Sequence, residues 1–225
     1  MSTVNSTPCR MIALLSDFGQ QDIYVAVLKG VIAQIHPQIR VLDLTHQIPP
    51  HDIAAARFNL INAVAYLPVG TVYIAVVDPG VGSQRRAIAL ETPQGYFVGP
   101  DNGVFSGIWQ PDTWIQGVEL THRAYWRTPD PSPTFHGRDI FAPVGAHLAC
   151  GVPLPHLGRA IAPESLVVGS ILAATATTRG MTGLIQYIDH FGNLITNIPG
   201  DWVQGQGWYS RVRSMTIPGC HTYSD

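Results

Sequence analysis

The feature that most constrains the fold is the alternation of apolar runs and helical patterns in the first part of the chain. Short apolar runs at residues 11–15, 40–44 and 72–77 are separated by two stretches with helical spacing of apolar residues. Asp22 and Asp52 stand where these two helices would be capped. The predicted buried faces consist of Ile23, Val27, Val31 and Ile35, and of Ile53, Ala56, Leu60 and Val64. The order strand, helix, strand, helix, strand is typical of right-handed crossovers and predicts an α/β domain with a parallel sheet.

The pattern changes after residue 86. We expect a hairpin at 87–91 and 96–98, a short helix after the turn at 99–103, a strand in 114–120 and a helix at 140–150. Beyond Pro163 helical periodicity disappears, and the segments 183–188, 194–198 and 211–217 are predicted as short strands. We therefore predict two domains, an α/β domain at residues 1–165 and a smaller β domain at residues 166–225.

The composition excludes several classes of function. Of the 225 residues, 46% are apolar and only 12% are charged, so much of the chain must be buried, in part against other subunits. The net charge of -2 predicts no nucleic-acid partner and no anionic membrane surface. No apolar run approaches the ~20 residues of a membrane helix, and the first ten residues do not form a signal peptide. We expect a cytoplasmic protein.

Aspartates follow several of the predicted strands. They are Asp17, Asp43, Asp78 and Asp101. Because ligands of open α/β sheets bind beyond the carboxyl ends of the strands, these side chains could line one polar cleft. Each could equally be a turn residue that caps its own backbone. No glycine-rich phosphate loop accompanies them, so a nucleotide phosphate is not expected.

His136 lies in a loop that follows a proline-rich segment, close to Arg138 and Asp139. A single histidine is more often structural than catalytic, but a loop position between Phe135 and Gly137 favours a functional role. A metal site remains open as the weaker alternative, without ligand spacing to support it. Its ligands would be His46, Asp78, Asp101 and His136.

Other nucleophiles and ligands find little support in the sequence. There is no Gly-x-Ser-x-Gly motif for a serine nucleophile. The three cysteines, Cys9, Cys150 and Cys220, are scattered, with neither metal-ligand spacing nor an even count for disulfides. Cys150 is expected in the core face of its helix.

A series of motifs resembles the S-adenosyl-L-methionine hydrolases (adenosine-forming), also called SAM hydroxide adenosyltransferases, which are relatives of the fluorinase and chlorinase. In the family's order they are Leu15–Gly19, Asp43–His46, Val77–Gly82, Gly99–Gly103, Phe135–Asp139 and Asp189–Asn193. The resemblance implies an N-terminal α/β/α sandwich with a largely parallel sheet, and a C-terminal β domain. It also implies a homotrimer with active sites between the N-terminal domain of one subunit and the C-terminal domain of the next.

The resemblance also implies roles for individual residues. The family's water-activating triad corresponds to Asp78, Arg85 and His136. The substrate-binding positions correspond to Asp17 for the ribose hydroxyls, Asp189 for the methionine amino group, Asn193 for the adenine edge, and Phe135, Phe191 and His51 for the pocket walls. No metal and no cofactor is implied, since S-adenosyl-L-methionine is the substrate.

The implied chemistry is attack of water on the ribose C5′, which yields adenosine and L-methionine. Methionine leaves as a neutral thioether, so the difficulty is the nucleophile, because bulk water has a pKa of about 15.7. We expect His136, oriented by Asp78, to accept the proton, and Arg85 to stabilise the developing hydroxide.

Two alternatives stay open. The first is a SAM-dependent halogenase, although halogenases carry Tyr, Thr and Ser where this chain has Asp78, Gly80 and Gly137, and a carboxylate would repel a halide. The second alternative arises because members of the family normally continue past the segment Thr222–Asp225 into further strands. The C-terminal domain is therefore expected to be incomplete relative to the family, and a SAM- or adenosine-binding protein without turnover is the second alternative.

Overall fold

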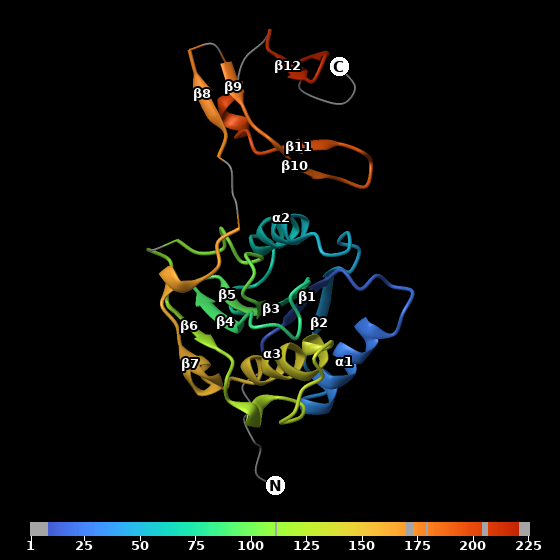
Figure 1. Ribbon diagram of the computed structural model, residues 1–225, viewed down its shortest axis with the longest axis vertical. Helices are drawn as coiled ribbons and strands as arrows, with labels where there is room; N and C mark the ends of the chain where they lie inside the picture. Colours follow the sequence, from blue (N-terminus) through green and yellow to red (C-terminus); the bar gives the residue numbers. More distant parts are fainter. Residues whose placement is uncertain (1–8, 111, 170–172, 179, 204–206, 221–225) are drawn as a thin grey trace. The chain divides into compact units, whose positions relative to one another are not determined.

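The computed structural model describes residues 9–220 except 111, 170–172, 179 and 204–206. The chain divides into two compact units, Met1–Ile171 and Leu172–Asp225, which are described separately (Figure 1). The first unit is α/β and the strands of the second form small antiparallel sheets, which confirms the predicted fold class. The domain boundary at residues 165 and 166 stays a prediction, and Thr222–Asp225 lies outside the described residues. Within the described chain, no helix has the length and apolar character required to span a membrane.

The first unit is built on a seven-stranded sheet with the order β2-β1-β3-β5-β4-β6-β7. The strands are β1 (Ile12–Ser16), β2 (Val41–Thr45), β3 (Thr71–Val76), β4 (Ala87–Thr92), β5 (Gly95–Pro100), β6 (Gln116–Glu119) and β7 (Arg159–Ala160). Strands β2, β1, β3 and β5 pair in parallel, and only β4 and β7 run in the opposite direction. Strands β1 and β3 are buried along their whole length, as expected of apolar runs covered on both faces.

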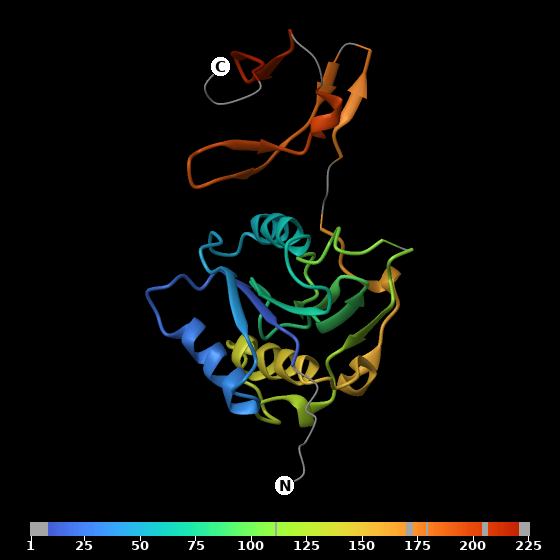
Figure 2. The same ribbon diagram turned by 180° about the vertical axis from the view of Figure 1, so that it is seen from behind.

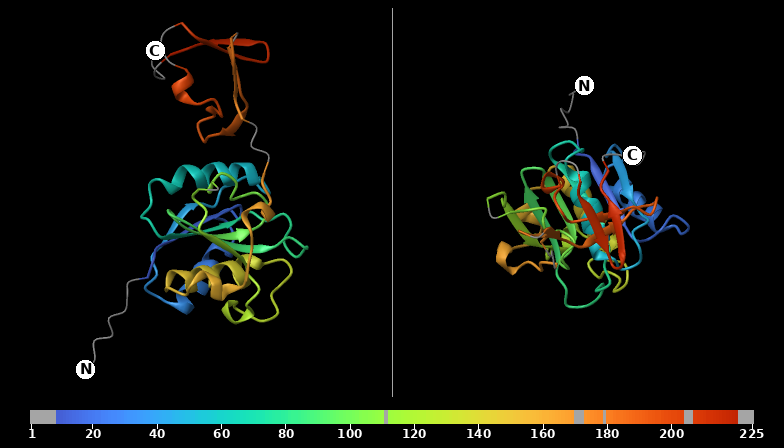
Figure 3. Two further views of the ribbon diagram at one scale, coloured as in Figure 1. Left: turned by 90° about the vertical axis from the view of Figure 1, so that its left-hand side faces the viewer. Right: turned by 90° about the horizontal axis from the view of Figure 1, so that it is seen from above.

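Helices cover both faces of this sheet, as Figure 2 and the left view of Figure 3 show. Helices α1 (Tyr24–Ile35) and α3 (Ala142–Ala149) lie on one face, and α2 (Ile53–Val64) lies on the other. Short helical turns complete the unit: η1 (Arg123–Tyr125), η2 (Gly137–Phe141), η3 (Leu154–Leu157) and η4 (Pro163–Ser165). The layers therefore form an α/β/α sandwich.

The two predicted helix caps differ in outcome. The Asp52 side chain accepts a hydrogen bond from Ala55 N at 2.9 Å, so the predicted cap of α2 is confirmed. The prediction for Asp22 is wrong, because α1 begins after Ile23 without a side-chain cap. Its predicted buried face is also partly wrong, since Ile23 is 72% exposed and the helix buries Leu28, Val31 and Ile32.

Two further predictions in the first unit need correction. The segment 101–108 forms turns and no helix, and Gly103 and Gly107 have φ values of 94° and 86°, which interrupt helical geometry. The predicted helix at 140–150 begins earlier than expected, because the π-helical turn η2 leads directly into α3. The predicted hairpin is confirmed as β4 and β5, and the strand predicted in 114–120 as β6.

Three hairpins account for the described strands of the second unit. They are β8 (Thr175–Thr177) with β9 (Gly180–Thr182), β10 (Ile185–Ile188) with β11 (Leu194–Thr196), and β12 (Tyr209–Val212) with β13 (Met215–Pro218). The turn η5 (Gly200–Trp202) lies between the last two hairpins. The single strand predicted at 211–217 is wrong, because the chain reverses at Arg213, whose φ is 52°.

Candidate functional site

The candidate site begins at the carboxyl ends of β1 and β3. In the parallel register of these strands Ser16 lies opposite Val76, so Asp17 and Asp78 follow neighbouring strand ends. The carbonyl oxygen of Val77 accepts a hydrogen bond from Asn102 Nδ2 at 2.9 Å, which ties the segment after β5 to the end of β3. The sheet therefore brings together loops that are far apart in the sequence.

Asp78, Arg85 and His136 form one cluster at this edge, so the structure brings all of the predicted triad together. Arg85 Nε donates to Asp78 Oδ1 at 2.8 Å, and Arg85 Nη2 donates to Asp78 Oδ2. The same Nη2 lies 2.8 Å from His136 Nδ1. The side chains of Asp78 and Arg85 are only 6% and 9% exposed, so this ion pair is shielded from water.

The contact with Arg85 determines the form of the His136 ring. A guanidinium can only donate, so Nδ1 accepts and the proton of the neutral imidazole lies on Nε2. Burial and the positive charge of Arg85 lower the pKa of His136 below its ordinary value, which favours this neutral form. Asp78 was expected to orient His136, and in the structure Arg85 bridges the two residues, so Asp78 acts on His136 through Arg85.

One guanidinium nitrogen of Arg85, Nη1, takes no part in the contacts with Asp78 and His136. Arg85 Nη1 is buried and donates to no group in the described part of the chain. The guanidinium carbon lies 5.3 Å from the ring centre of Phe141, which contributes a cation–π contact. An unpaired buried donor costs about 1–3 kcal/mol, so an oxygen placed beside Nη1 would be strongly stabilised.

Glycines allow the two loops of the cluster to approach each other and the sheet. Gly82 has a φ of 76°, and a Cβ there would collide with the carbonyl oxygen of Pro133. A Cβ on Gly137 would lie 3.2 Å from Val76 Cγ1. The loop after β3 and the loop before α3 can therefore pack closely enough for Arg85 to reach His136.

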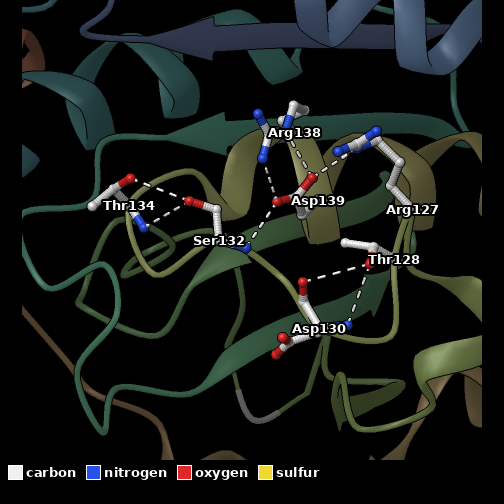
Figure 4. Close-up of polar contacts among 7 residues, drawn as sticks. All are labelled: Arg127, Thr128, Asp130, Ser132, Thr134, Arg138 and Asp139. Atoms are coloured by element: carbon white, nitrogen blue, oxygen red, sulfur yellow. Dashed lines mark hydrogen bonds and ion pairs between the residues drawn. The ribbon is translucent and has the colours of Figure 1, made fainter.

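Asp139 anchors the loop that carries His136 (Figure 4). Its buried carboxylate accepts hydrogen bonds from Arg127 Nε at 2.8 Å, from Arg138 Nε and Nη2 at 2.7 Å each, and from Ser132 N at 2.9 Å. Burial alone would raise the pKa of Asp139, but these hydrogen bonds hold it well below its ordinary value. Asp139 is therefore an ionised anchor for this loop.

Asp17 is held in the adjacent loop. Its Oδ2 accepts a hydrogen bond from the backbone N of His51 at 2.9 Å, and His51 is exposed with a φ of 67°. Two buried residues, Ser16 and His46, lie behind this loop, of which Ser16 was not predicted and His46 was considered only as a metal ligand. Ser16 Oγ lies 2.7 Å from His46 Nδ1, and His46 Nε2 lies 3.1 Å from Asp43 Oδ1. Their only sequence signal was a strand-end serine and a histidine within motifs of the resemblance.

An aromatic cluster lies beside the same loops. Phe18, Tyr24 and Phe135 have ring centres 5.5–5.8 Å apart, with edge-on or tilted geometry. The guanidinium carbon of Arg138 lies 5.0 Å from the centre of the Phe135 ring. Phe135 was predicted as a pocket wall, whereas Phe18 and Tyr24 were not. An aromatic surface of this kind suits a flat base or a sulfonium.

The remaining predicted residues belong to the second unit, in the turn between β10 and β11. Asp189 Oδ1 accepts hydrogen bonds from Phe191 N and Asn193 N at 2.9 Å each, and Asp189 Oδ2 accepts one from Asn193 Nδ2 at 2.7 Å. The hydrogen bond from the Asn193 side chain is the main cause that lowers the pKa of Asp189. Phe191 is 86% exposed. Their substrate-binding roles stay predictions.

The other strand-end aspartates have structural partners. Asp101 pairs with Arg86, and Asp43 pairs with Lys29 and contacts His46, so the polar cleft of four aspartates is not supported. The four-residue metal site is not supported either. Over the described residues, the one compact group of metal-ligating side chains consists of Cys9, His36 and Cys150. The cysteines that appeared scattered in sequence are thus partly adjacent in space. The prediction that Cys150 lies in the core face of its helix is wrong, because Cys150 is the exposed C-cap of α3.

Known proteins resemble this chain over most of its length. The family model described as SAM hydroxide adenosyltransferase N-terminal domain matches residues 12–158, and the corresponding C-terminal domain model matches residues 183–225. A protein of Salinispora tropica named (R)-S-adenosyl-L-methionine hydrolase is 41% identical, with 97% of this chain and 83% of that protein covered. A fluorinase of an Actinoplanes species is 29% identical, with 95% of this chain and 80% of that protein covered.

The fold is also similar to a solved structure. The crystal structure of an uncharacterized conserved protein from Thermotoga maritima is 36% identical to this chain, with a TM-score of 0.86. The match covers 92% of this chain and 81% of the Thermotoga maritima chain. The sequence motifs, the α/β fold and both domain matches indicate the same family. This chain therefore belongs to the SAM hydroxide adenosyltransferase family.

Proposed function

We propose that this protein hydrolyses S-adenosyl-L-methionine to adenosine and L-methionine. Its family membership and its similarity to a protein named (R)-S-adenosyl-L-methionine hydrolase support this activity. The observation that carries the proposal is the shielded Asp78–Arg85–His136 cluster with one unpaired guanidinium donor. Such a cluster can bind and polarise a water molecule at a sheet edge where ligands usually bind.

The reaction that suits this cluster is displacement at the ribose C5′. The oxygen of water forms a bond to C5′ while the bond from C5′ to sulfur breaks, and methionine leaves as a neutral thioether. Because the sulfonium charge disappears as hydroxide character develops, a site of low polarity favours the transition state. The low exposure of the Asp78 and Arg85 side chains indicates that bulk water has little access to this site.

The contacts support roles for two residues, His136 and Asp78, that differ from those expected from the sequence. Arg85 would donate Nη1 to the nucleophilic oxygen and stabilise its negative charge. His136 offers Nε2–H, and Nδ1 is occupied by Arg85, so His136 would orient the water as a donor. Asp78 retains carboxylate lone pairs and would accept the proton. His136 as the proton acceptor is not supported by this geometry.

The substrate-binding roles belong to the same proposal. Asp17 would accept the ribose hydroxyls, and Phe135, with Phe18 and Tyr24, would contact the sulfonium end of the substrate. Asp189, Asn193, Phe191 and His51 keep the roles implied by the family. No metal and no cofactor takes part in the proposed reaction.

Halogenation is less well supported than hydrolysis. A Cβ on Gly80 would lie 3.2 Å from Arg85 Cγ, and one on Gly137 would lie 3.2 Å from Val76 Cγ1. The Thr and Ser expected of a halogenase would therefore crowd Arg85 and β3. Asp78 would in addition place a negative charge beside the halide.

We also propose that the protein acts as a homotrimer in the cytoplasm, with sites completed by neighbouring subunits. Exposed apolar side chains gather in the second unit around β10 and β11 and suit burial against another chain. They are Leu184, Ile185, Ile188, Phe191 and Leu194. Light scattering after size-exclusion chromatography would test the mass, and a monomer at working concentration would contradict this assembly.

The activity is tested with purified protein, S-adenosyl-L-methionine and water labelled with heavy oxygen. Hydrolysis predicts adenosine that carries the label, with an equal amount of methionine. A parallel reaction in excess chloride or fluoride tests the halogenase. Unlabelled adenosine, halogenated adenosine or binding by calorimetry without turnover would each contradict the proposed reaction.

A further inference from the structure

We propose that Cys9, His36 and Cys150 form a Zn²⁺ site that is separate from the Asp78 cluster. Cys9 Sγ and Cys150 Sγ lie 3.4 Å apart, and the ligand atoms of all three residues lie within 4.8 Å of one another. Two sulfurs and one imidazole nitrogen form a ligand set that Zn²⁺ prefers, with water in the fourth position. This inference does not depend on the proposed hydrolysis.

The distances fit zinc better than a disulfide. With Zn–S bonds of about 2.3 Å and tetrahedral angles, the two sulfurs would lie about 3.8 Å apart. The observed 3.4 Å requires a shift of a few tenths of an ångström, whereas a disulfide requires about 2.05 Å between the sulfurs. All three cysteines are free thiols in the structure.

His36 provides an independent observation. Its Nδ1 is buried and has no hydrogen-bond partner in the described part of the chain. Its backbone N–H ends α1 by donating to Ile32 O, so the residue is held at the helix terminus. A buried imidazole nitrogen without a partner is unfavourable, and a metal ion bound to Nδ1 would relieve that cost.

The backbone around the cluster also favours a cation. His36 is the C-cap of α1 and Cys150 is the C-cap of α3, so the negative ends of two helix dipoles meet the site. The last turn of α1 has no basic residue. At α3, Arg10 N donates to Ala149 O and Arg10 Nη1 donates to Leu148 O, which fixes the segment that carries Cys9.

Charge balance follows from the ligands. The two sulfurs share a hydrogen bond at 3.4 Å, so at least one of the thiols carries a proton without metal. On binding, each thiol releases its proton to solvent, two Zn–S bonds and one Zn–N bond form, and two thiolates neutralise the charge of Zn²⁺. No oxidation is involved.

The site lies at the opposite edge of the sheet from the proposed reaction. Cys9 precedes β1, whereas Asp78 follows β3, and these strands are parallel. Zinc at this position would join the N-terminal segment to the ends of α1 and α3. A water in the fourth position is typical of catalytic zinc. Because this site lies far along β1 and β3 from Asp78, we assign it the role of stabilising one helical layer of the first unit.

Metal binding by the 225-residue protein tests the site. The reduced, metal-free chain would be titrated with Co²⁺, whose thiolate charge-transfer and tetrahedral ligand-field bands report the ligands, and then with Zn²⁺ in competition. We expect one ion per chain, displacement of Co²⁺ by Zn²⁺, and a rise in Tm of about 5–10 °C at a Zn²⁺ concentration 100-fold above Kd.

Variants identify the ligands. Cys9→Ser, Cys150→Ser and His36→Gln should each weaken binding by more than about 100-fold, beyond the usual effect of an outer-sphere change. Cys220→Ser is the matched control, because this exposed cysteine lies in the second unit, and it should bind as the unaltered protein does. Absence of the thiolate bands would overturn the site. So would bands that survive Cys9→Ser and Cys150→Ser, or a Cys9–Cys150 disulfide in the protein as isolated.

Discussion

Arg85 and Arg86 are neighbours in sequence, and each pairs with an aspartate that follows a strand. Arg86 Nε and Nη2 donate to Asp101 Oδ2 at 2.9 and 2.5 Å, as Arg85 Nε and Nη2 donate to the two oxygens of Asp78. The Arg86 pair is completed within the protein. Arg86 Nη1 donates to Ser165 Oγ at 3.1 Å, and Asp101 Oδ1 accepts from Val167 N at 2.9 Å. The Arg85 pair keeps one buried donor, Nη1, that has no partner among the described residues.

This difference shows that one kind of ion pair, arginine with aspartate, can have two uses. A structural pair satisfies its polar atoms with its own chain, and Asp101 thereby fastens the segment after η4 to the end of β5. A pair that is left incomplete keeps binding capacity for another molecule. The sequence Arg85-Arg86 does not distinguish the two, because the distinction depends on which loops each guanidinium reaches.

The largest expected effect is the loss of turnover when the incomplete pair is changed. Asp78→Asn should lower kcat for hydrolysis by about 100- to 10,000-fold, because the amide cannot accept the proton from water. Asp101→Asn is the matched change in the completed pair and should keep kcat within about tenfold. Chromatography of adenosine measures both. Equal losses in the two variants would contradict the division between them.

The reverse contrast is expected in stability. Asp101→Ala should lower the free energy of unfolding by about 3 kcal/mol, because it leaves Arg86 and Val167 N without their buried acceptor. This corresponds to a fall in Tm of about 6–12 °C for a chain of this size. Calorimetry or urea unfolding would measure it. A variant with unchanged Tm would show that the Arg86 pair does not fasten this segment.

His136 contacts the Asp78–Arg85 pair, so the activity of that site is expected to depend on pH. The proposed role needs neutral His136, and burial and Arg85 lower its pKa, so the neutral form persists below the ordinary value of about 6.5. The value of kcat/KM should therefore stay nearly constant as the pH falls to about 6.5 and should decline only at lower pH. A half-maximal rate above that pH would contradict this assignment, as would an unchanged acid limb in His136→Gln.

A smaller effect is expected behind Asp17. Ser16 Oγ accepts a hydrogen bond from Phe18 N at 3.3 Å and contacts His46, so this buried pair positions the loop of Asp17. Ser16→Ala should raise KM for S-adenosyl-L-methionine by several-fold, with little change in kcat. This corresponds to a loss of about 1 kcal/mol of binding free energy when the hydrogen bond that positions the loop is removed. Thr216→Ala, which removes an exposed hydroxyl on β13 of the second unit, is the control. A change in kcat alone would contradict a positioning role.

Much of the fold could be predicted because it depends on short-range patterns. The apolar runs identified β1, β2 and β3, and Asp52 identified the start of α2. Errors arose where local patterns compete with backbone geometry, as at Gly103 and Gly107, where positive φ replaced the expected helix. At Arg213 a positive φ turned one predicted strand into a hairpin.

The sequence by itself determined the α/β order, the strand that ends at Asp78 and the family motifs, because each depends on residues close together in the chain. Only the tertiary structure decided which of these residues meet. Arg85 reaches His136 across 51 residues, and Cys9 reaches Cys150 across 141. The close approach of Gly82 to Pro133 and the hydrogen bond from Arg10 N to Ala149 O hold these segments together, and neither contact is encoded in the spacing of any one segment.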